Sequence, residues 1–296
     1  MSNSPAQPRI LFVSADVIFI PNRSEHMTRC MVINSEECAD DLAGLIVGLY
    51  DLGVDVHVVQ PDYRQIFAAT SREIQDKKAK MMPAGQIHLT EDRVFFYSNC
   101  TDSNYKWENI KISIAFQREV IHQIIPTVQP DLIHCHDWMT GLIPAAAKKL
   151  EIPCLFTVHK PDTAKSLLAS VEDMGIDAAA FWQYLFYDRY PANYEETRET
   201  NPVNFLLSGI FAAPVVTVGG FAFLMKKEQH RNPFTELPMS EILADKLNTG
   251  GPSIHNTQSF NLHHYINTYE RMLRQPVINV NMKNRKSRSM PARLAA

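Results

Sequence analysis

The sequence lacks several features that assign a chain to a specialised class of protein. Its five cysteines are dispersed, with no two at the spacing of a metal-binding or redox motif. They therefore predict free thiols in a reducing compartment rather than a disulfide framework. The formal net charge is only -3 over 296 residues, which argues against a basic surface for nucleic acid or for a membrane. We expect an ordinary globular protein that binds neither of these partners.

The sequence also lacks an apolar run long enough to cross a membrane. The longest run, Ile210–Met225, is interrupted by a proline and two glycines, whereas a transmembrane helix needs about 20 apolar residues. The first eight residues are polar and carry prolines, unlike the basic and then apolar start of a secretory signal. We therefore expect a cytoplasmic protein with disordered tails at 1–8 and 283–296.

Apolar runs and helical periodicity alternate along the chain. Buried strands are predicted at Arg9–Ser14, Val54–Gln60, Arg93–Ser98, Leu132–Cys135, Cys154–Val158 and Val215–Val218. Helices are predicted at Ala39–Leu52, Ile114–Val128, Met139–Leu150, Asp177–Tyr187, Val203–Ala212, Ser240–Leu247 and Leu262–Leu273. This alternation predicts an α/β protein with a single Rossmann-like, doubly wound parallel sheet covered by helices on both faces.

Polar side chains gather where the predicted strands end. Ligands of such sheets bind beyond the carboxyl ends of the strands, which directs attention to Ser14–Asp16, His134–Trp138 and His159–Lys160. The densest of these segments is His134–Trp138, with the sequence HCHDW. Since side chains alternate along a strand, His134 and His136 are predicted to lie on the same side of it.

Three interpretations of the HCHDW segment remain open from the residues alone. A His-x-His pair with the Asp137 carboxylate is a candidate zinc site of a metal-dependent hydrolase, although the sequence contains neither HExxH nor CxxC. A structural interpretation has the imidazoles and the carboxylate bonding loop amides while Trp138 packs. A third interpretation is a sugar site, where carboxylate and imidazole take hydrogen bonds from hydroxyls beside an aromatic ring.

The HCHDW segment belongs to a longer pattern that resembles a known family. HCHDWMTGL at 134–142, followed by LFTVH at 155–159, is similar to the HxHDWxxGL…FTxHN pattern of bacterial glycogen and starch synthases, glycosyltransferase family five. Other segments match in the same order, namely the opening strand with Asp16-Val17, LGVDVHVVQPDY at 52–63, and NFLLSGI at 204–210. The resemblance covers roughly residues 9–220.

This resemblance implies a GT-B fold, in which two Rossmann-like domains enclose a cleft. The implied reaction is transfer of glucose from ADP-glucose to an α-1,4-glucan with retention, with no metal and no cofactor beyond the donor substrate. The implied acceptor is an α-glucan or maltooligosaccharide. The resemblance implies that the catalytic residues are His159 and Asp137, and that the substrate-binding residues are His136, Trp138, Asp16 and Asn204.

The sequence departs from the family pattern in three places. The family's Lys-x-Gly-Gly-Leu loop is replaced by Ile18–Cys38, which contains no glycine, so we expect no close approach of backbone to a nucleotide sugar there. Lys160 replaces an asparagine, and Gly219-Gly220 replaces Ser-Pro. Nothing after Gly220 is long enough for the second Rossmann domain, which in the family holds the diphosphate.

These departures predict a truncated synthase-like protein of α-1,4-glucan metabolism that is weak or inactive alone. One lost electrostatic contact to a leaving group costs about 10²–10³ in rate. We expect a domain at 9–250, a crossover helix at 258–276, and a partner protein or a second copy that supplies the missing domain. The alternative is a non-catalytic glucan-binding or regulatory module that docks on a synthase. Glucosyl transfer from ADP-glucose would separate the two hypotheses.

Overall fold

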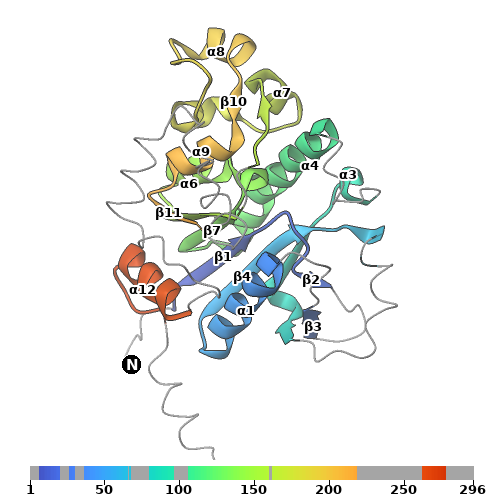
Figure 1. Ribbon diagram of the computed structural model, residues 1–296, viewed down its shortest axis with the longest axis vertical. Helices are drawn as coiled ribbons and strands as arrows, with labels where there is room; N and C mark the ends of the chain where they lie inside the picture. The colour runs from blue at the N-terminus through green and yellow to red at the C-terminus, as the bar shows by residue number, and fades with distance from the viewer. Residues whose placement is uncertain are drawn as a thin grey trace, which may run out of the picture.

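The computed structural model describes residues 7–20, 27–30, 37–65, 67, 80–96, 106–159, 162–218 and 262–277. At its centre is a six-stranded sheet of order β11-β8-β7-β1-β4-β6, in which all neighbours are parallel (Figure 1). Its strands are β1 (Arg9–Val13), β4 (Asp55–Pro61), β6 (Ile87–Thr90), β7 (Leu132–His136), β8 (Cys154–Val158) and β11 (Val215–Val218). The predicted parallel α/β sheet is confirmed.

Helices cover both faces of this sheet. One face carries α1 (Glu37–Asp51) and α12 (Leu262–Leu273). The opposite face carries α4 (Lys106–Glu119), α5 (Ile125–Val128), α6 (Ile143–Lys149) and α9 (Phe205–Ala212). This division follows from the alternation of side chains along β1. Ile10 and Phe12 pack on the face that carries α1 and α12. Leu11 and Val13 pack on the opposite face.

The helix α12 packs on the sheet as the sequence predicts. Its buried side chains Tyr265, Ile266 and Tyr269 share one core with α1 and β1. Their spacing of one and four residues places them on one helix face. In Figure 1, α12 lies beside the amino end of β1, although the two are far apart in the chain. Among the described residues, no helix has the length and apolar character needed to cross a bilayer.

Smaller elements complete the described structure. An antiparallel sheet contains β2 (Phe19–Ile20), β3 (Met27–Cys30) and β5 (Lys80–Pro83), and a two-stranded one pairs β9 (Lys165–Ser166) with β10 (Val203–Asn204). Short helices are α3 (Arg93–Phe96), α7 (Leu168–Asp173) and α8 (Tyr194–Thr200). Single 3₁₀ turns lie at Ala84–Gln86, Trp138–Thr140, Ala178–Ala180 and Trp182–Tyr184, and a π-helical turn joins α4 to α5 at Val120–Ile124.

The predicted strand at Arg93–Ser98 is wrong. The structure has helix α3 there, because Asp92 caps it: its Oδ1 accepts from the Val94 amide at 2.9 Å and its carbonyl accepts from Phe95 at 3.0 Å. A cap of this kind outweighs the β preference of the apolar residues that follow. The edge strand of the sheet is instead β6, which the sequence analysis missed.

The predicted helix at Asp177–Tyr187 is also wrong. Two 3₁₀ turns replace it, and Phe181 between them has φ −142°, which is outside the helical range. The helix predicted at Val203–Ala212 starts two residues later, at Phe205. The helix predicted at Ser240–Leu247 and the domain boundary at 250 lie outside the described residues.

Candidate sugar site at the strand ends

Three histidines meet where β7 and β8 end. His134 and His136 lie on β7, their ring centroids are 4.2 Å apart, and they share one side of the strand as predicted. His159 directly follows β8, and its Nε2 lies 3.0 Å from Nδ1 of His136. The rings of His136 and His159 are stacked, with centroids 5.3 Å apart. All three side chains are buried, so the structure brings together the histidines that the sequence singled out.

His134 belongs to a buried chain of hydrogen bonds. Its Nδ1 lies 2.8 Å from the hydroxyl of Tyr269, and its Nε2 lies 2.7 Å from Oγ1 of Thr157. Thr157 in turn lies 2.6 Å from Oγ1 of Thr217 on β11. Because both ring nitrogens are engaged, the structural interpretation holds for His134. The sequence shows no signal for Tyr269 as its partner, since the two are 135 residues apart.

Burial keeps the inner histidines uncharged. Desolvation lowers the pKa of His134 and of His136 well below 6.5, and neighbouring histidines lower both pKa values further. At neutral pH these rings are therefore neutral donors and acceptors of hydrogen bonds. The Nε2 atom of His136 is buried and has no hydrogen-bond partner among the described residues, which is uncommon for a buried polar atom.

Asp137 ties the ends of the two strands together. Its Oδ1 accepts a 2.7 Å hydrogen bond from the His159 amide, and its own amide donates to the carbonyl of Thr157 at 3.0 Å. Its backbone adopts φ +60° and ψ 177°, a conformation that costs about 1–3 kcal/mol in a residue other than glycine. Strain of this kind clusters at functional sites. The structure thus joins the two residues that the resemblance implies as catalytic.

Trp138 and Gly141 form the turn that leaves this site. The half-buried Trp138 ring lies 6.4 Å from the ring of Phe205 on α9. A Cβ atom on Gly141 would lie 1.9 Å from the carbonyl oxygen of Phe205, so only glycine allows this turn to meet α9. The tryptophan and the glycine of the HDWxxG pattern are therefore explained by packing against one helix.

Asp16 lies at the same edge of the sheet, because it follows β1 and β1 is the neighbour of β7. Its side chain is exposed. The segment after it is fixed by Gln60, whose Oε1 accepts from the amides of Ile18 and Phe19 at 3.0 and 2.9 Å. The Gln60 Nε2 donates to the Phe19 carbonyl at 2.6 Å. At the place where the family pattern has a glycine-rich loop, this chain therefore has a buried, hydrogen-bonded segment that leads into β2.

Sequence reasoning missed Gln60, although a signal was present. Gln60 is a polar residue at the end of an apolar strand, at the place where the family pattern VVLPRY has leucine. Its side chain is fully buried, and buried amides in proteins are normally satisfied by hydrogen bonds. An isolated glutamine in that position therefore indicates a nearby backbone segment that needs partners.

The Asn204 side chain caps α9. Its Oδ1 accepts from the Leu207 amide at 3.0 Å and from the Thr163 hydroxyl at 2.7 Å. This oxygen therefore satisfies a backbone donor of the first helical turn, as N-cap side chains do. The substrate-binding role that the resemblance implies for Asn204 stays a prediction.

Replacing Asn204 by alanine should lower the free energy of unfolding by about 1–2 kcal/mol, because the Leu207 amide would be buried without a partner. Urea denaturation measures the loss. A matched control is Asn193→Ala, which removes the exposed cap of α8, an acceptor for the Glu196 amide at 2.9 Å. Water can replace that cap, so we expect a smaller loss there. An equal loss at both caps would contradict the argument.

The zinc interpretation finds no support in the described part of the chain. There, no three His, Cys, Asp or Glu side chains are grouped so that they could hold a metal ion. The nearby thiols of Cys135 and Cys154 are free and buried on the opposite face of the sheet from the histidines. Burial and the neighbouring thiol raise the pKa of Cys135 well above its ordinary value, which makes it a poor nucleophile or ligand.

Comparison with known proteins identifies the family. The family described as "Starch synthase catalytic domain" matches residues 32–219, which is more than half of the chain. The chain belongs to the starch synthase catalytic domain family. The catalytic domain of starch synthase IV from Arabidopsis thaliana, bound to ADP and acarbose, superposes with a TM-score of 0.52 at 15% identity. That match covers 98% of this chain and 61% of the plant chain, and it confirms the fold class.

Curated relatives of this starch synthase family domain are bacterial glycogen synthases. The enzyme of Exiguobacterium sibiricum is 28% identical over an alignment of 147 residues, and the match covers 41% of this chain and 30% of the relative. The enzyme of Desulforamulus reducens is 25% identical over an alignment of 194 residues, and the match covers 55% of this chain and 40% of the relative. The chain thus matches less than half the length of either relative, and the family resemblance is confirmed for that part.

Proposed function

We propose that this domain binds an α-1,4-glucan at the carboxyl ends of β7 and β8 and transfers glucose weakly or not at all by itself. The observation that carries the proposal is the hydrogen bond from the His159 amide to Asp137. It holds a carboxylate and an imidazole together at the strand ends, where ligands of α/β sheets bind. The half-buried Trp138 adds an aromatic surface beside them, as sugar sites commonly have.

The chemistry of these groups suits a polyhydroxyl ligand. Neutral imidazoles both donate and accept hydrogen bonds, and a carboxylate accepts them from hydroxyl groups. Neither group requires a charged ligand. In this proposal His159 and Asp137 face the reacting sugars, while His136 and Trp138 support them. Residues 9–250 form the glucan-binding domain, and the helix within 258–276 covers it.

The segment after β1, where the family binds its sugar donor, is the reason to expect weak transfer of glucose. Glucosyl transfer in this family uses ADP-glucose, and a glycine-rich loop lets backbone amides approach such a donor. Here the segment after β1 contains Ile18 and Phe19, which are buried and bonded to Gln60. A partner protein or a second copy would supply the diphosphate clamp. Equal turnover of ADP-glucose by this chain alone and by a complete glycogen synthase would overturn this half of the proposal.

Calorimetric titration with maltoheptaose tests the glucan-binding half. We expect millimolar or tighter binding by the wild type and at least about tenfold weaker binding by Asp137→Asn, since a charged hydrogen bond is worth about 1.5–3 kcal/mol. Asp51→Asn is the matched control, because Asp51 ends α1 at the opposite edge of the sheet. It should bind like the wild type. No binding by the wild type, or unchanged binding by Asp137→Asn, would reject the site.

A further inference from the structure

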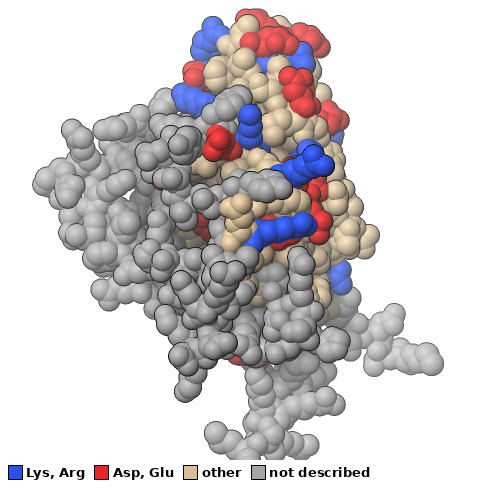
Figure 2. Space-filling model, turned by 90° about the vertical axis from the view of Figure 1, so that its right-hand side faces the viewer, with Lys and Arg blue, Asp and Glu red and all other residues tan. Residues whose placement is uncertain are grey.

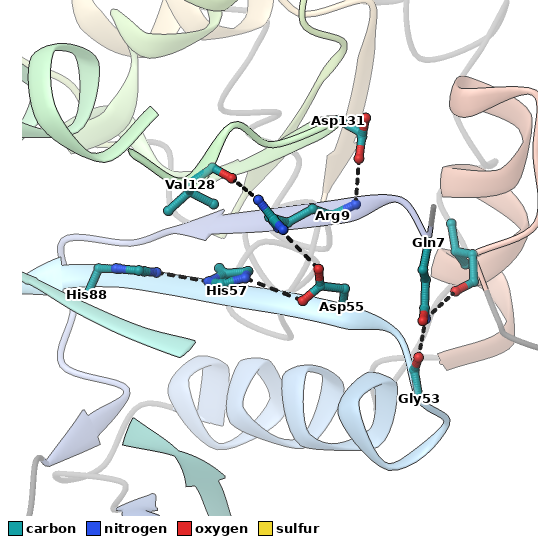
Figure 3. A network of polar contacts seen from close by, with 9 residues as sticks. Gln7, Arg9, Gly53, Asp55, His57, His88, Val128 and Asp131 are labelled. Atoms are coloured by element: carbon teal, nitrogen blue, oxygen red, sulfur yellow. Dashed lines mark hydrogen bonds and ion pairs between the residues drawn. The ribbon is translucent and has the colours of Figure 1, made fainter. Parts of the chain in front are cut away.

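A second histidine pair lies away from the strand-end site, near the amino end of β4. His57 on β4 and His88 on the edge strand β6 face each other, with 2.9 Å between Nδ1 of His57 and Nε2 of His88 (Figure 3). The other nitrogen of His57, Nε2, lies 3.3 Å from Oδ1 of Asp55. The Asp55 Oδ2 atom accepts from Nε of Arg9 at 3.1 Å.

The carboxylate of Asp55 orients the His57 ring. It favours the proton on Nε2 of His57, which leaves the lone pair of Nδ1 directed at His88. A carboxylate behind an imidazole in this way is the arrangement that proteins use to orient metal-ligating histidines. Arg9 contacts the other oxygen of that carboxylate and the carbonyl of Val128, so its charge is compensated within the same network.

Both rings are held in the form that binds metals. Desolvation lowers the pKa of His57, and desolvation with the neighbouring ring lowers the pKa of His88 to about 4. Both imidazoles are therefore neutral at pH 7, as metal ligation requires. The side chain of His57 retains 16% of its exposed surface, so water can reach the pair.

The spacing of the rings fits a tetrahedral ion. With metal–nitrogen distances of about 2.0 Å, two imidazole nitrogens in a tetrahedral site lie about 3.3 Å apart, and their ring centres about 5 Å apart. The ring centroids of His57 and His88 are 5.2 Å apart already. The two nitrogens are only 2.9 Å apart in the hydrogen bond, so both rings would have to tilt to admit an ion between them.

We propose that His57 and His88 bind one divalent first-row metal ion of the class that favours imidazole, such as zinc, with water completing its coordination. The hydrogen bond between the rings is exchanged for two metal–nitrogen bonds, and the proton on Nε2 of His88 moves to its Nδ1. The ion links the edge strand β6 to β4, which are paired at Val59 and His88. This proposal is independent of the glucan site.

Titration of the metal-free protein with zinc chloride tests the pair. Two protein ligands predict one site of micromolar affinity, and His57→Gln or His88→Gln should weaken it at least about tenfold. Asp55→Asn removes the carboxylate that orients His57 and that also pairs with Arg9, and loss of such an orienting group typically costs about 10–100-fold in metal affinity. His122→Gln and His263→Gln are matched controls, because both histidines are exposed, and they should leave the affinity unchanged.

Two further measurements keep the proposal falsifiable if a variant folds poorly. Zinc should raise the midpoint of thermal unfolding of the wild type but not of the double variant His57→Gln/His88→Gln. The electron paramagnetic resonance spectrum of the wild type with one equivalent of Cu²⁺ should show two coordinating imidazole nitrogens. No zinc binding by the wild type, equal affinity in the double variant, or a copper spectrum without two imidazoles would each overturn the site.

Discussion

Replacing Gly141 by alanine is expected to lower the free energy of unfolding by about 3 kcal/mol or more. The new Cβ would lie 1.9 Å from the carbonyl oxygen of Phe205 and 2.5 Å from its carbonyl carbon. Overpacking normally costs about 1–3 kcal/mol, and here the obstacle is main chain, which cannot move aside by rotating a side chain. The turn after β7 must therefore separate from α9. Urea denaturation followed by circular dichroism measures the loss.

Gly85→Ala is the matched control for this substitution. A Cβ on Gly85 meets nothing within 4 Å, so the free energy of unfolding should change by no more than about 0.5 kcal/mol. Gly209→Ala should fall between the two, because its Cβ would meet ring atoms of Phe156 at 2.5 Å and a ring can shift. If Gly141→Ala and Gly85→Ala were equally stable, the contact between the turn and α9 would be wrong.

Acidification is expected to destabilise this protein through its buried histidines. Folding lowers the pKa of His134 and His136 well below 6.5, chiefly by desolvation, whereas the unfolded chain takes up these protons as the pH falls through 6.5. The unfolded state then binds more protons, so the free energy of unfolding is fully retained above pH 6.5 and falls below it. From about pH 7.5 to 5.5 we expect these two histidines alone to cause a loss of about 3 kcal/mol, or about 1.4 kcal/mol each.

Urea denaturation at a series of pH values tests this dependence. His134→Gln should reduce the loss by about 1.4 kcal/mol, because glutamine can still bond Tyr269 and Thr157 but does not titrate. The lowered pKa values of His57 and His88 act in the same direction. His263→Gln is the control, since His263 is exposed on α12. A free energy of unfolding that stays constant over this range would show that the inner histidines are open to water.

The parallel sheet could be predicted because its central strands are short, buried segments that are rich in apolar residues. Leu132–His136 and Cys154–Val158 are buried at every position, and burial on both faces produces such runs. The edge strand β6 was missed, because its sequence IHLT is half polar and three of its four residues are only partly buried. The wrong strand at Arg93–Ser98 has a local cause, since Asp92 caps a helical turn there.

The candidate site was predictable in outline but not in its connections. The rule that ligands bind beyond strand ends located His136, Asp137 and His159, and alternation placed the histidines on one side of β7. Other bonds around the site join elements that are distant in the chain, such as the bond of Tyr269 on α12 to His134 and that of Gln60 on β4 to Ile18. No local pattern relates positions so far apart. The proposed roles of these residues toward the acceptor glucan and the sugar donor are therefore a matter for experiment.

Figure 2 shows acidic and basic side chains interspersed over the described part of one face of the domain. No region of a single sign covers the described surface in that view. A neutral ligand gains little from long-range steering by such a surface. An uncharged sugar polymer would therefore find this domain through contacts at short range, in agreement with the small formal net charge of -3.

The bond between Tyr269 and His134 also has a consequence for the order in which the chain folds. The two residues are 135 positions apart, and at a synthesis rate of about 5–20 residues per second this separation takes roughly 7–30 seconds to translate. During that time β7 is already made, but the helix that carries Tyr265, Ile266 and Tyr269 is not. The part of that sheet face which α12 covers thus stays open until the helix is made, although α1 already covers the rest, and chaperones have that interval in which to bind it.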